Sequence, residues 1–320
     1  PMSTHIERFK KTENALKKFH QKSTNKKLRI RDIANHLNVS EAELLSLDIN
    51  QSVQFLAIDK IESFFNEILS KIDKVMFLIR TDFVVHEKIV TANEFICEKN
   101  SVLNKKDNSL LIKFNSEMFT YIFYENKKHN NRNLKSFQFF DQNGTSILKI
   151  YLKGKKDIEF ESIANDYKVK YDFEIQKNVS LTTKQNTSLI SHDIDLFNSK
   201  PKINQKELKL SLRELLNTLS EKAIPIQLYA FGIDCIQYHR DVIKNIVDYG
   251  PWLNVMDKNF NIHILENKII KNILTEYVSK NNKRYSADFY DTNNDFVIGV
   301  SVTKDFELDF IKILNGEKVQ

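Results

Sequence analysis

Apolar residues in the first quarter of the chain recur at helical spacing. The stretch IERFKKTENALKKFHQK predicts a surface helix, and KLRIRDIANHLNVSEAELLSLD predicts two short helices joined by a turn. Ser40 followed by Glu43 is the pattern of a capping box and places the second of these helices at Glu41 to Leu45. Isoleucine and phenylalanine then repeat at three and four, which predicts a longer helix from Lys60 to Asp73.

After this helix the period of the pattern changes to two. The runs KVMFLIRTDFVVHEKIV, NSLLIKFNSEMFTYIFYEN and LKSFQFFDQNGTSILKIYLKG are rich in β-branched and aromatic residues, which is typical of strands. Asn143-Gly144 in the last run predicts a two-residue hairpin turn. We therefore expect an antiparallel meander.

A polar stretch without a sustained period divides the chain. QKNVSLTTKQNTSLISHDIDLFNSKPKINQK is rich in Ser, Thr, Asn and Lys, as linkers are, and a helix from Gln205 to Leu219 is predicted after it. The expected organisation is an N-terminal repeat at residues 1–175, a linker at 176–204 and a C-terminal repeat at 205–320.

The second half of the chain repeats the first. SFQFFDQNGT aligns with SADFYDTNND, with Asp141 opposite Asp291, and FVVHEK aligns with IQYHRD, with His86 opposite His239. MFTYIFYEN also aligns with NFNIHILEN. The predicted fold class is α+β: a tandem duplication of a helix plus antiparallel-sheet unit, giving two large β-sheets flanked by helices.

The composition limits the classes of protein to which the chain can belong, but it does not identify the protein. The 320 residues are 41% hydrophobic and 28% charged with a net charge of +6, so the chain can bury a sizeable core. A basic block between Lys10 and Arg31 is typical of a solvated helix face. Cys97 and Cys235 are predicted to be reduced, buried thiols, and no apolar run is long enough to span a bilayer. We expect a cytoplasmic protein that is not embedded in a membrane.

Several stretches together resemble the family of cytoplasmic haemin-degrading or haem-trafficking factors of the HemS and ChuS type. They are LRIRDIANHLNVSEAELL, VMFLIRTDFVVHEK, LKSFQFFDQNGTSILKIYL, CIQYH and GPWLNVMDKNFNIHI, in the family's order and at its spacing. The resemblance implies a two-repeat α+β fold and haem held between a sheet and helices of the C-terminal half. It also implies haem as ligand or substrate, delivered by an inner-membrane haem permease; some members open the haem ring, and others pass haem on to a separate haem oxygenase.

The resemblance implies candidate haem contacts. Its ligand histidine lies just after the linker, and the nearest match is SHDIDLF, which makes His192 the candidate iron ligand, although the Asp-Pro that precedes it in the family is absent here. The alternative for His192 is an exposed linker histidine. The family's arginine on an N-terminal strand falls at Ile112, with the candidate Lys113 beside it. One residue along a strand reverses the face, so the alternatives for Lys113 are a side chain that points away from the cleft and one that points inward and neutralises a haem propionate, without the bidentate contact of an arginine.

Two further lysines fall near the family's propionate-binding positions. Lys280 in EYVSKNN and Lys304 in SVTKDF are candidates for charged contacts with haem carboxylates, the alternative being solvated surface lysines. His86, His239 and His263 lie in predicted strands, where a histidine bonded to its neighbours is the commoner case.

Four functions are weighed from these features. The first is a haem-binding carrier of haem uptake and iron acquisition; the second is an enzyme that also opens the haem ring, which the missing arginine disfavours. The third is the family fold with a decayed haem site that binds another ligand. The fourth is a DNA-binding regulator using RDIANHLNVSEAELL as a helix-turn-helix, which Glu41 and Glu43 disfavour because they would face phosphates, so no specific nucleic acid partner is expected.

Overall fold

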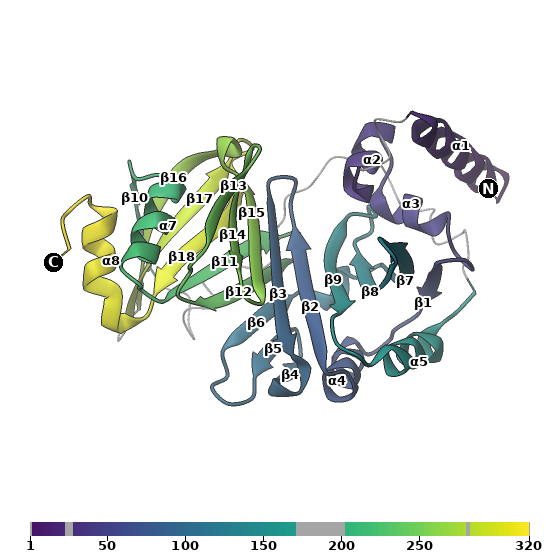
Figure 1. The fold of residues 1–320 in the computed structure, drawn as a ribbon, viewed down its shortest axis with the longest axis horizontal. Coiled ribbons are helices and arrows are strands. Elements are labelled where there is room, and N and C mark those ends of the chain that lie inside the picture. Colours follow the sequence, from purple (N-terminus) through teal and green to yellow (C-terminus); the bar gives the residue numbers. More distant parts are fainter. Residues whose placement is uncertain (1, 23–27, 171–201, 280–281, 320) are drawn as a thin grey trace. The chain divides into compact units, whose positions relative to one another are not determined.

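The computed structural model describes residues 2–22, 28–170, 202–279 and 282–319. Its fold class is α+β, with two large antiparallel sheets flanked by helices, as the sequence predicts (Figure 1). The chain divides into two compact units. The first comprises residues 1–75, 91–93 and 116–185, and the second comprises residues 76–90, 94–115 and 186–320. Among the described helices, none is long and apolar enough to cross a membrane.

The first unit combines helices with one run of strands. Its elements are α1 (Met2–Gln21), α2 (Ile30–Leu37), α3 (Glu41–Ser46), β1 (Val53–Leu56), α4 (Ile61–Lys71), η3 (Ser116–Met118), β7 (Tyr121–His129), β8 (Arg132–Phe140), β9 (Ser146–Leu152) and α5 (Asp157–Tyr167). The strand order is β1-β7-β8-β9, and Phe64 of α4 packs edge-on against Phe137 of β8. Aromatic side chains of α4, α5 and this sheet form the core.

The three N-terminal helices form where the apolar spacing predicts them. Ser40 caps α3 by accepting a hydrogen bond from the Glu43 backbone N–H. All six residues of α3 are buried, and its two acidic side chains are paired: Glu43 accepts two hydrogen bonds from Arg8, and Glu41 lies 3.2 Å from the amine of Lys149. A recognition helix must present its side chains to a groove of DNA. The burial of α3 therefore argues against a helix-turn-helix regulator.

The second unit holds most of the strands. Its elements are β2 (Lys74–Arg80), β3 (Val84–Thr91), β4 (Phe95–Glu98), β5 (Ser101–Asn104), β6 (Leu110–Phe114), β10 (Lys202–Glu207), α7 (Leu212–Glu221), β11 (Ile226–Gly232), β12 (Cys235–Asp241), β13 (Ile246–Tyr249), β14 (Trp252–Asp257), β15 (Phe260–Leu265), η5 (Glu266–Lys268), β16 (Ile269–Ser279), β17 (Asn282–Asp291), β18 (Phe296–Val302), η6 (Lys304–Phe306) and α8 (Glu307–Leu314).

One nine-stranded sheet lies wholly within this second unit. Its order is β10-β16-β17-β18-β11-β12-β6-β5-β4, so the hairpin strands β4 to β6, which precede the linker, continue a sheet built from strands that follow it. Ile112 of β6 is paired with Gln237 of β12, and both are fully buried. A second run of strands in the unit has the order β2-β3-β15-β14-β13, in which Ile262 is paired with His86.

The duplication is visible in two matching loops. After β8, the Asp141 carboxylate accepts hydrogen bonds from the backbone of Asn143 and Thr145; at the end of β17, Asp291 does the same for Asn293 and Asp295. The predicted alignment of these two aspartates is confirmed. The two-residue turn predicted at Asn143-Gly144 is wrong, because the Asp141 side chain organises a five-residue loop between Phe140 and Ser146.

Two other sequence expectations are corrected. The helix predicted from Gln205 begins at Leu212, and residues 202–207 form β10, which is paired with β16. The alignment of MFTYIFYEN with NFNIHILEN is also wrong: β7 lies between β1 and β8, whereas β15 lies between β3 and β14. By position in the sheets, the counterpart of β7 is β16, between β10 and β17. In both stretches apolar and polar residues alternate, and both end in Glu-Asn. Such a pattern predicts a β-strand but does not predict which strands lie next to it in the sheet.

Candidate ligand-binding face

Aromatic residues gather on one face of the nine-stranded sheet. The register of β11 and β12 places Tyr229 opposite Tyr238 and Phe231 opposite Ile236, so all four point to the same side. They form one buried cluster against which Phe296 of β18 packs. The rings of Tyr229 and Tyr238 are 5.7 Å apart and 34° from parallel. We call these five residues the aromatic face; four of them are at most 6% exposed, and only Phe296 is partly exposed.

A buried polar network fixes Tyr229. Its hydroxyl hydrogen-bonds to Ser286, and Ser286 donates in turn to one oxygen of Asp288 at 2.6 Å. Thr275 donates to the other carboxylate oxygen at 2.6 Å, and Tyr277 approaches the same oxygen. Because the single proton of Ser286 goes to Asp288, the tyrosine hydroxyl must be the donor to Ser286.

The environment of this network keeps Tyr229 protonated. Burial raises the pKa of Tyr229 well above its usual value, and the nearby charge of Asp288 raises it further. Glycine at position 299 makes the arrangement possible: a Cβ atom there would lie 2.1 Å from Cζ of Tyr229. The tyrosine ring can therefore cross β18 and reach Ser286 on β17 only because residue 299 has no side chain.

Two cationic side chains belong to the same face. The guanidinium carbon of Arg240 lies 5.2 Å from the ring centre of Tyr238, and the guanidinium also donates to the Leu110 carbonyl. Burial lowers the pKa of Arg240, while Tyr238 and Asp107 oppose that change. Lys113 of β6 is paired with Ile236, which puts it on the aromatic side of the sheet, and the buried Ile112 takes the opposite side.

The other candidate haem contacts do not gather around Lys113. Lys304 is exposed at the start of η6. The strand register puts Lys113 near the level of Ile298 on β18, whereas Lys304 follows the end of that strand. At about 3.3 Å per residue, the two lysines are roughly 20 Å apart along the strand direction. His192 and Lys280 lie outside the described residues, so their proposed roles stay predictions.

The paired histidines His86 and His239 occupy the opposite side of β12. His86 accepts a hydrogen bond from Gln237 at 2.9 Å through Nδ1 and lies 3.3 Å from the Leu228 carbonyl through Nε2. His239 stacks flat on Phe260 at 3.6 Å between ring centres. Burial lowers the pKa of His86 to about 3 and that of His239 to about 2. Both are neutral core residues turned away from the aromatic face.

His263 has a local structural environment. Its Nδ1 lies 2.7 Å from the side-chain oxygen of Asn254, and its Nε2 lies 3.9 Å from Glu87. It belongs to β15, in the other run of strands. The three histidines described in the second unit therefore all lie off the aromatic face. The described residues also contain no group of three or more His, Cys, Asp or Glu able to hold a metal ion, and Cys97 and Cys235 are buried thiols that form no disulfide with each other.

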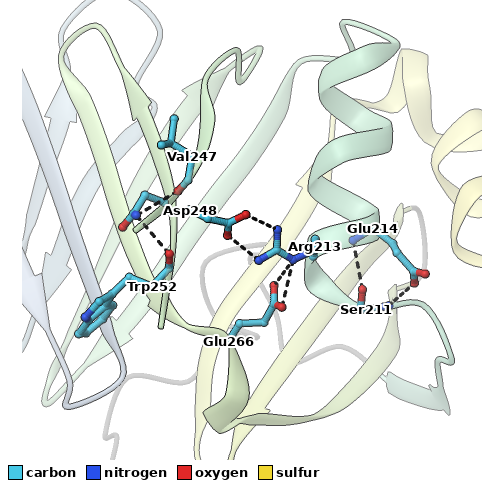
Figure 2. Close-up of polar contacts among 8 residues, drawn as sticks. Ser211, Arg213, Glu214, Val247, Asp248, Trp252 and Glu266 are labelled. Atoms are coloured by element: carbon cyan, nitrogen blue, oxygen red, sulfur yellow. Dashed lines mark hydrogen bonds and ion pairs between the residues drawn. The ribbon is translucent and has the colours of Figure 1, made fainter. Parts of the chain in front are cut away.

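An arginine clamp holds the start of α7. Arg213 donates to both oxygens of Asp248 in β13 and to Glu266 in η5, as Figure 2 shows. The helix begins with a full capping box, in which Ser211 and Glu214 satisfy each other's backbone N–H groups. These contacts fix α7 against the strands around it.

Sequence reasoning missed several members of the face. Arg240 directly follows His239, and Tyr238 directly precedes it; with β12 recognised as a strand, alternation alone would have put both on the side away from the histidine. Tyr229 and Phe231 alternate in the same way along β11. Asp288 carries no local signal, because its role arises from neighbouring strands.

The fold and the face define a class of protein: a duplicated α+β chain whose second unit holds a buried aromatic cluster with cationic side chains at its edge. The family model described as "Haemin-degrading HemS.ChuX domain" matches residues 38–167 and 192–309, one match for each repeat. The chain belongs to this family.

Relatives and solved structures agree with the assignment. The chain is 21% identical over 291 residues to the hemin transport protein HemS of Yersinia enterocolitica, covering 78% of this chain and 80% of the relative. It is similar in fold to holo-PhuS, a heme-binding protein from Pseudomonas aeruginosa, with a TM-score of 0.77, 18% identity and coverage of 96% and 98% of the two chains. The heme-degrading enzyme ChuS of Escherichia coli O157:H7 gives a TM-score of 0.74 at 18% identity, with coverage of 92% and 96%.

Proposed function

We propose that this protein binds haem on the aromatic face of its second unit and carries it within the cytoplasm as part of haem uptake and iron acquisition. The observation that carries the proposal is the aromatic face itself, with Lys113 and Arg240 on the same side of the sheet. A porphyrin is a large planar π system that stacks on such rings, and its two propionates are carboxylates that pair with cations.

The residues fit haem in a definite way. Phe296, the partly exposed ring of the aromatic face, would contact the porphyrin, with Tyr229 and Phe231 packed behind it, and Arg240 and Lys113 would pair with carboxylates. Because the described histidines of the second unit lie off this face, the axial nitrogen would come from His192, at the start of the second family match. Bound iron supplies the redox chemistry of the ring; the protein supplies stacking, orientation and charge pairing.

Carriage is favoured over ring opening by the state of Tyr229. Ring opening requires a proton source at the ligand, and the tyrosine proton is directed into Ser286 and Asp288 instead. A carrier of this kind would receive haem from an inner-membrane permease and deliver it to a separate haem oxygenase. Transfer would be seen as a shift of the Soret band when the haem-loaded protein is mixed with an oxygenase.

Titration with haemin tests the proposal. Wild-type protein should give a shifted Soret band that saturates at one equivalent, and His192→Ala should change the position of the band. Arg240→Gln should weaken binding about tenfold or more, since a charge-assisted contact contributes about 1.5–3 kcal/mol. Lys258→Gln, in an exposed turn, is the matched control. Free-haem spectra at equimolar ratio would show that the protein does not bind haem and would overturn the proposal.

The ring-opening alternative has its own readout. Haem-loaded protein is incubated with ascorbate, or with NADPH and a reductase, and the Soret band is followed for hours. A stable band agrees with a carrier, and steady loss of the band with release of iron would establish degradation.

A further inference from the structure

One side of helix α1 is fixed against its neighbours in the first unit. Phe19 of α1 is buried together with Ile33 of α2 and Leu44 of α3 (Figure 1). Arg8 donates two hydrogen bonds to the Glu43 carboxylate, at 2.8 and 3.0 Å. Because these contacts hold one side of the helix, the opposite side faces solvent in a defined orientation.

The solvent-facing side of α1 is a row of lysines. Its exposed cations are Lys10, Lys11, Lys17 and Lys18, with Lys22 directly after the helix. At 100° and 1.5 Å per residue, the four helical lysines lie within an arc of about 120° and a length of about 12 Å. We refer to these five lysines as the basic face.

The charge of the basic face is only partly balanced by nearby carboxylates. Within the described part of the chain, Lys17 is the one member that forms an ion pair, with Glu13 at 3.8 Å. Glu7 is the one exposed acidic residue of α1, where residues 6–21 have a described exposure. The five lysines therefore outnumber these two acids, and the helix presents a net positive surface.

The chemistry of the basic face fits a diffuse anionic surface. All its cations are lysines, which act as flexible point charges, whereas arginine is preferred where a nucleic acid is recognised through fork geometry. The exposed residues of α1 include no Phe, Tyr or Trp that could stack on a base. Ile6, 40% exposed and one turn before Lys10, adds an apolar side chain to the same side of the helix.

We propose that the basic face docks this protein on a membrane surface that carries anionic phospholipids. The lysine ammonium groups pair with headgroup phosphates, and Ile6 enters the boundary between headgroups and acyl chains. The contact is peripheral and reversible, because salt screens every one of these charges. It is independent of haem binding, since the basic face belongs to the first unit and the aromatic face to the second.

Co-sedimentation of the haem-free, full-length protein with lipid vesicles tests the docking. Vesicles of phosphatidylcholine with about 30% phosphatidylglycerol should bind the protein at about 50 mM salt, and vesicles of phosphatidylcholine alone should not. Salt at about 0.5 M should release the bound protein. Equal binding to both kinds of vesicle, or binding to neither, would overturn the proposal.

Two double variants separate the basic face from net charge. Lys17→Gln with Lys18→Gln should weaken binding to the anionic vesicles about 25-fold, or about fivefold for each lysine. Lys105→Gln with Lys106→Gln removes the same charge from an exposed turn between β5 and β6, and binding should stay within about twofold of wild type. Equal losses in the two variants would show that α1 is not the docking surface.

A haemin titration and a DNA competitor complete the test. Both double variants should give the Soret titration of the wild type, so a failure of vesicle binding is distinguishable from a failure of haem binding. Duplex DNA should displace vesicle-bound protein only when its phosphates exceed the anionic lipids in number. Tighter binding to the duplex than to vesicles, lost in the Lys17 and Lys18 variant, would assign the basic face to nucleic acid and overturn the proposal.

Discussion

At the scale of single residues, burial sets the protonation of His86 and His239. The unfolded chain takes up these protons near pH 6.5, whereas the folded pKa values are about 3 and about 2. The neutral imidazoles therefore stabilise the fold fully above pH 6.5, and this stability is lost as pH falls from 6.5 toward 3. Urea unfolding at pH 7.5, 6.0 and 5.0 should show a free energy of unfolding that falls by about 1.4 kcal/mol per pH unit for each histidine at most.

His239→Phe is the control for that pH dependence. It keeps a ring stacked against Phe260 and leaves only His86 to titrate. Carboxylic acids titrate in part of the same pH range in both proteins. The quantity to compare is therefore the difference between wild type and variant in the slope of unfolding free energy against pH. The variant should lose about half of the histidine-dependent slope. Equal slopes would mean that His239 is already solvated in the folded state.

Gly299 governs the position of Tyr229. In Gly299→Ala the new methyl carbon would lie 2.1 Å from the tyrosine ring, so either the ring leaves Ser286 or the strands move apart. We expect a loss of about 1–3 kcal/mol in the free energy of unfolding, the usual cost of overpacking. Gly232→Ala is the matched control in the neighbouring strand, because its methyl would meet Ile79 at an ordinary 3.7 Å. Equal stability losses in urea would contradict this account.

At the scale of elements, Arg213 joins α7 to β13 and η5. Its side chain is 37% exposed, so Arg213→Ala should cost only about 1 kcal/mol despite its several hydrogen bonds. Hydrogen exchange should become faster both in the first turn of α7 and in residues 246–249. Arg213→Lys should restore little, because one ammonium cannot bond both carboxylates in fork geometry. Ser211→Ala should affect the helix start alone. Unchanged hydrogen exchange in β13 would contradict the proposal that Arg213 holds α7 and β13 together.

Local patterns predicted many of the elements, and the errors share one cause. The spacing of apolar residues located α2, α3 and α4 within a few residues. This works because the buried face of a helix is formed by residues three and four apart in the sequence. Residues 202–204 were expected in the linker and residues 205–207 at the start of a helix, but residues 202–207 form the edge strand β10 beside β16. The Asp141 loop was read as Asn143-Gly144 because the sequence does not show an aspartate side chain replacing a backbone turn.

At the scale of the whole molecule, the sequence alone also does not show which strands come together to form the aromatic face. Lys113 was found through family resemblance, and the register of β6 with β12 was needed to decide which way it points. Arg240 and Asp288 entered the site only through contacts between strands distant in sequence. A single sequence shows which residues alternate along a strand, but the facing strand is chosen by packing of the entire unit.

The arrangement of strands also predicts how the halves of the chain depend on each other. In the second unit, β6 is paired with β12 and β3 with β15, and each pair joins a segment before the linker to one after it. A protease site inserted between residues 176 and 204, the proposed linker, should yield two pieces that co-elute in gel filtration and separate only in denaturant. Residues 1–175 made alone should aggregate, since Ile112 and Phe114 would lose the strand that buries them. The uncut chain is the control, and two pieces that elute separately as folded monomers would show that each repeat is an independent domain.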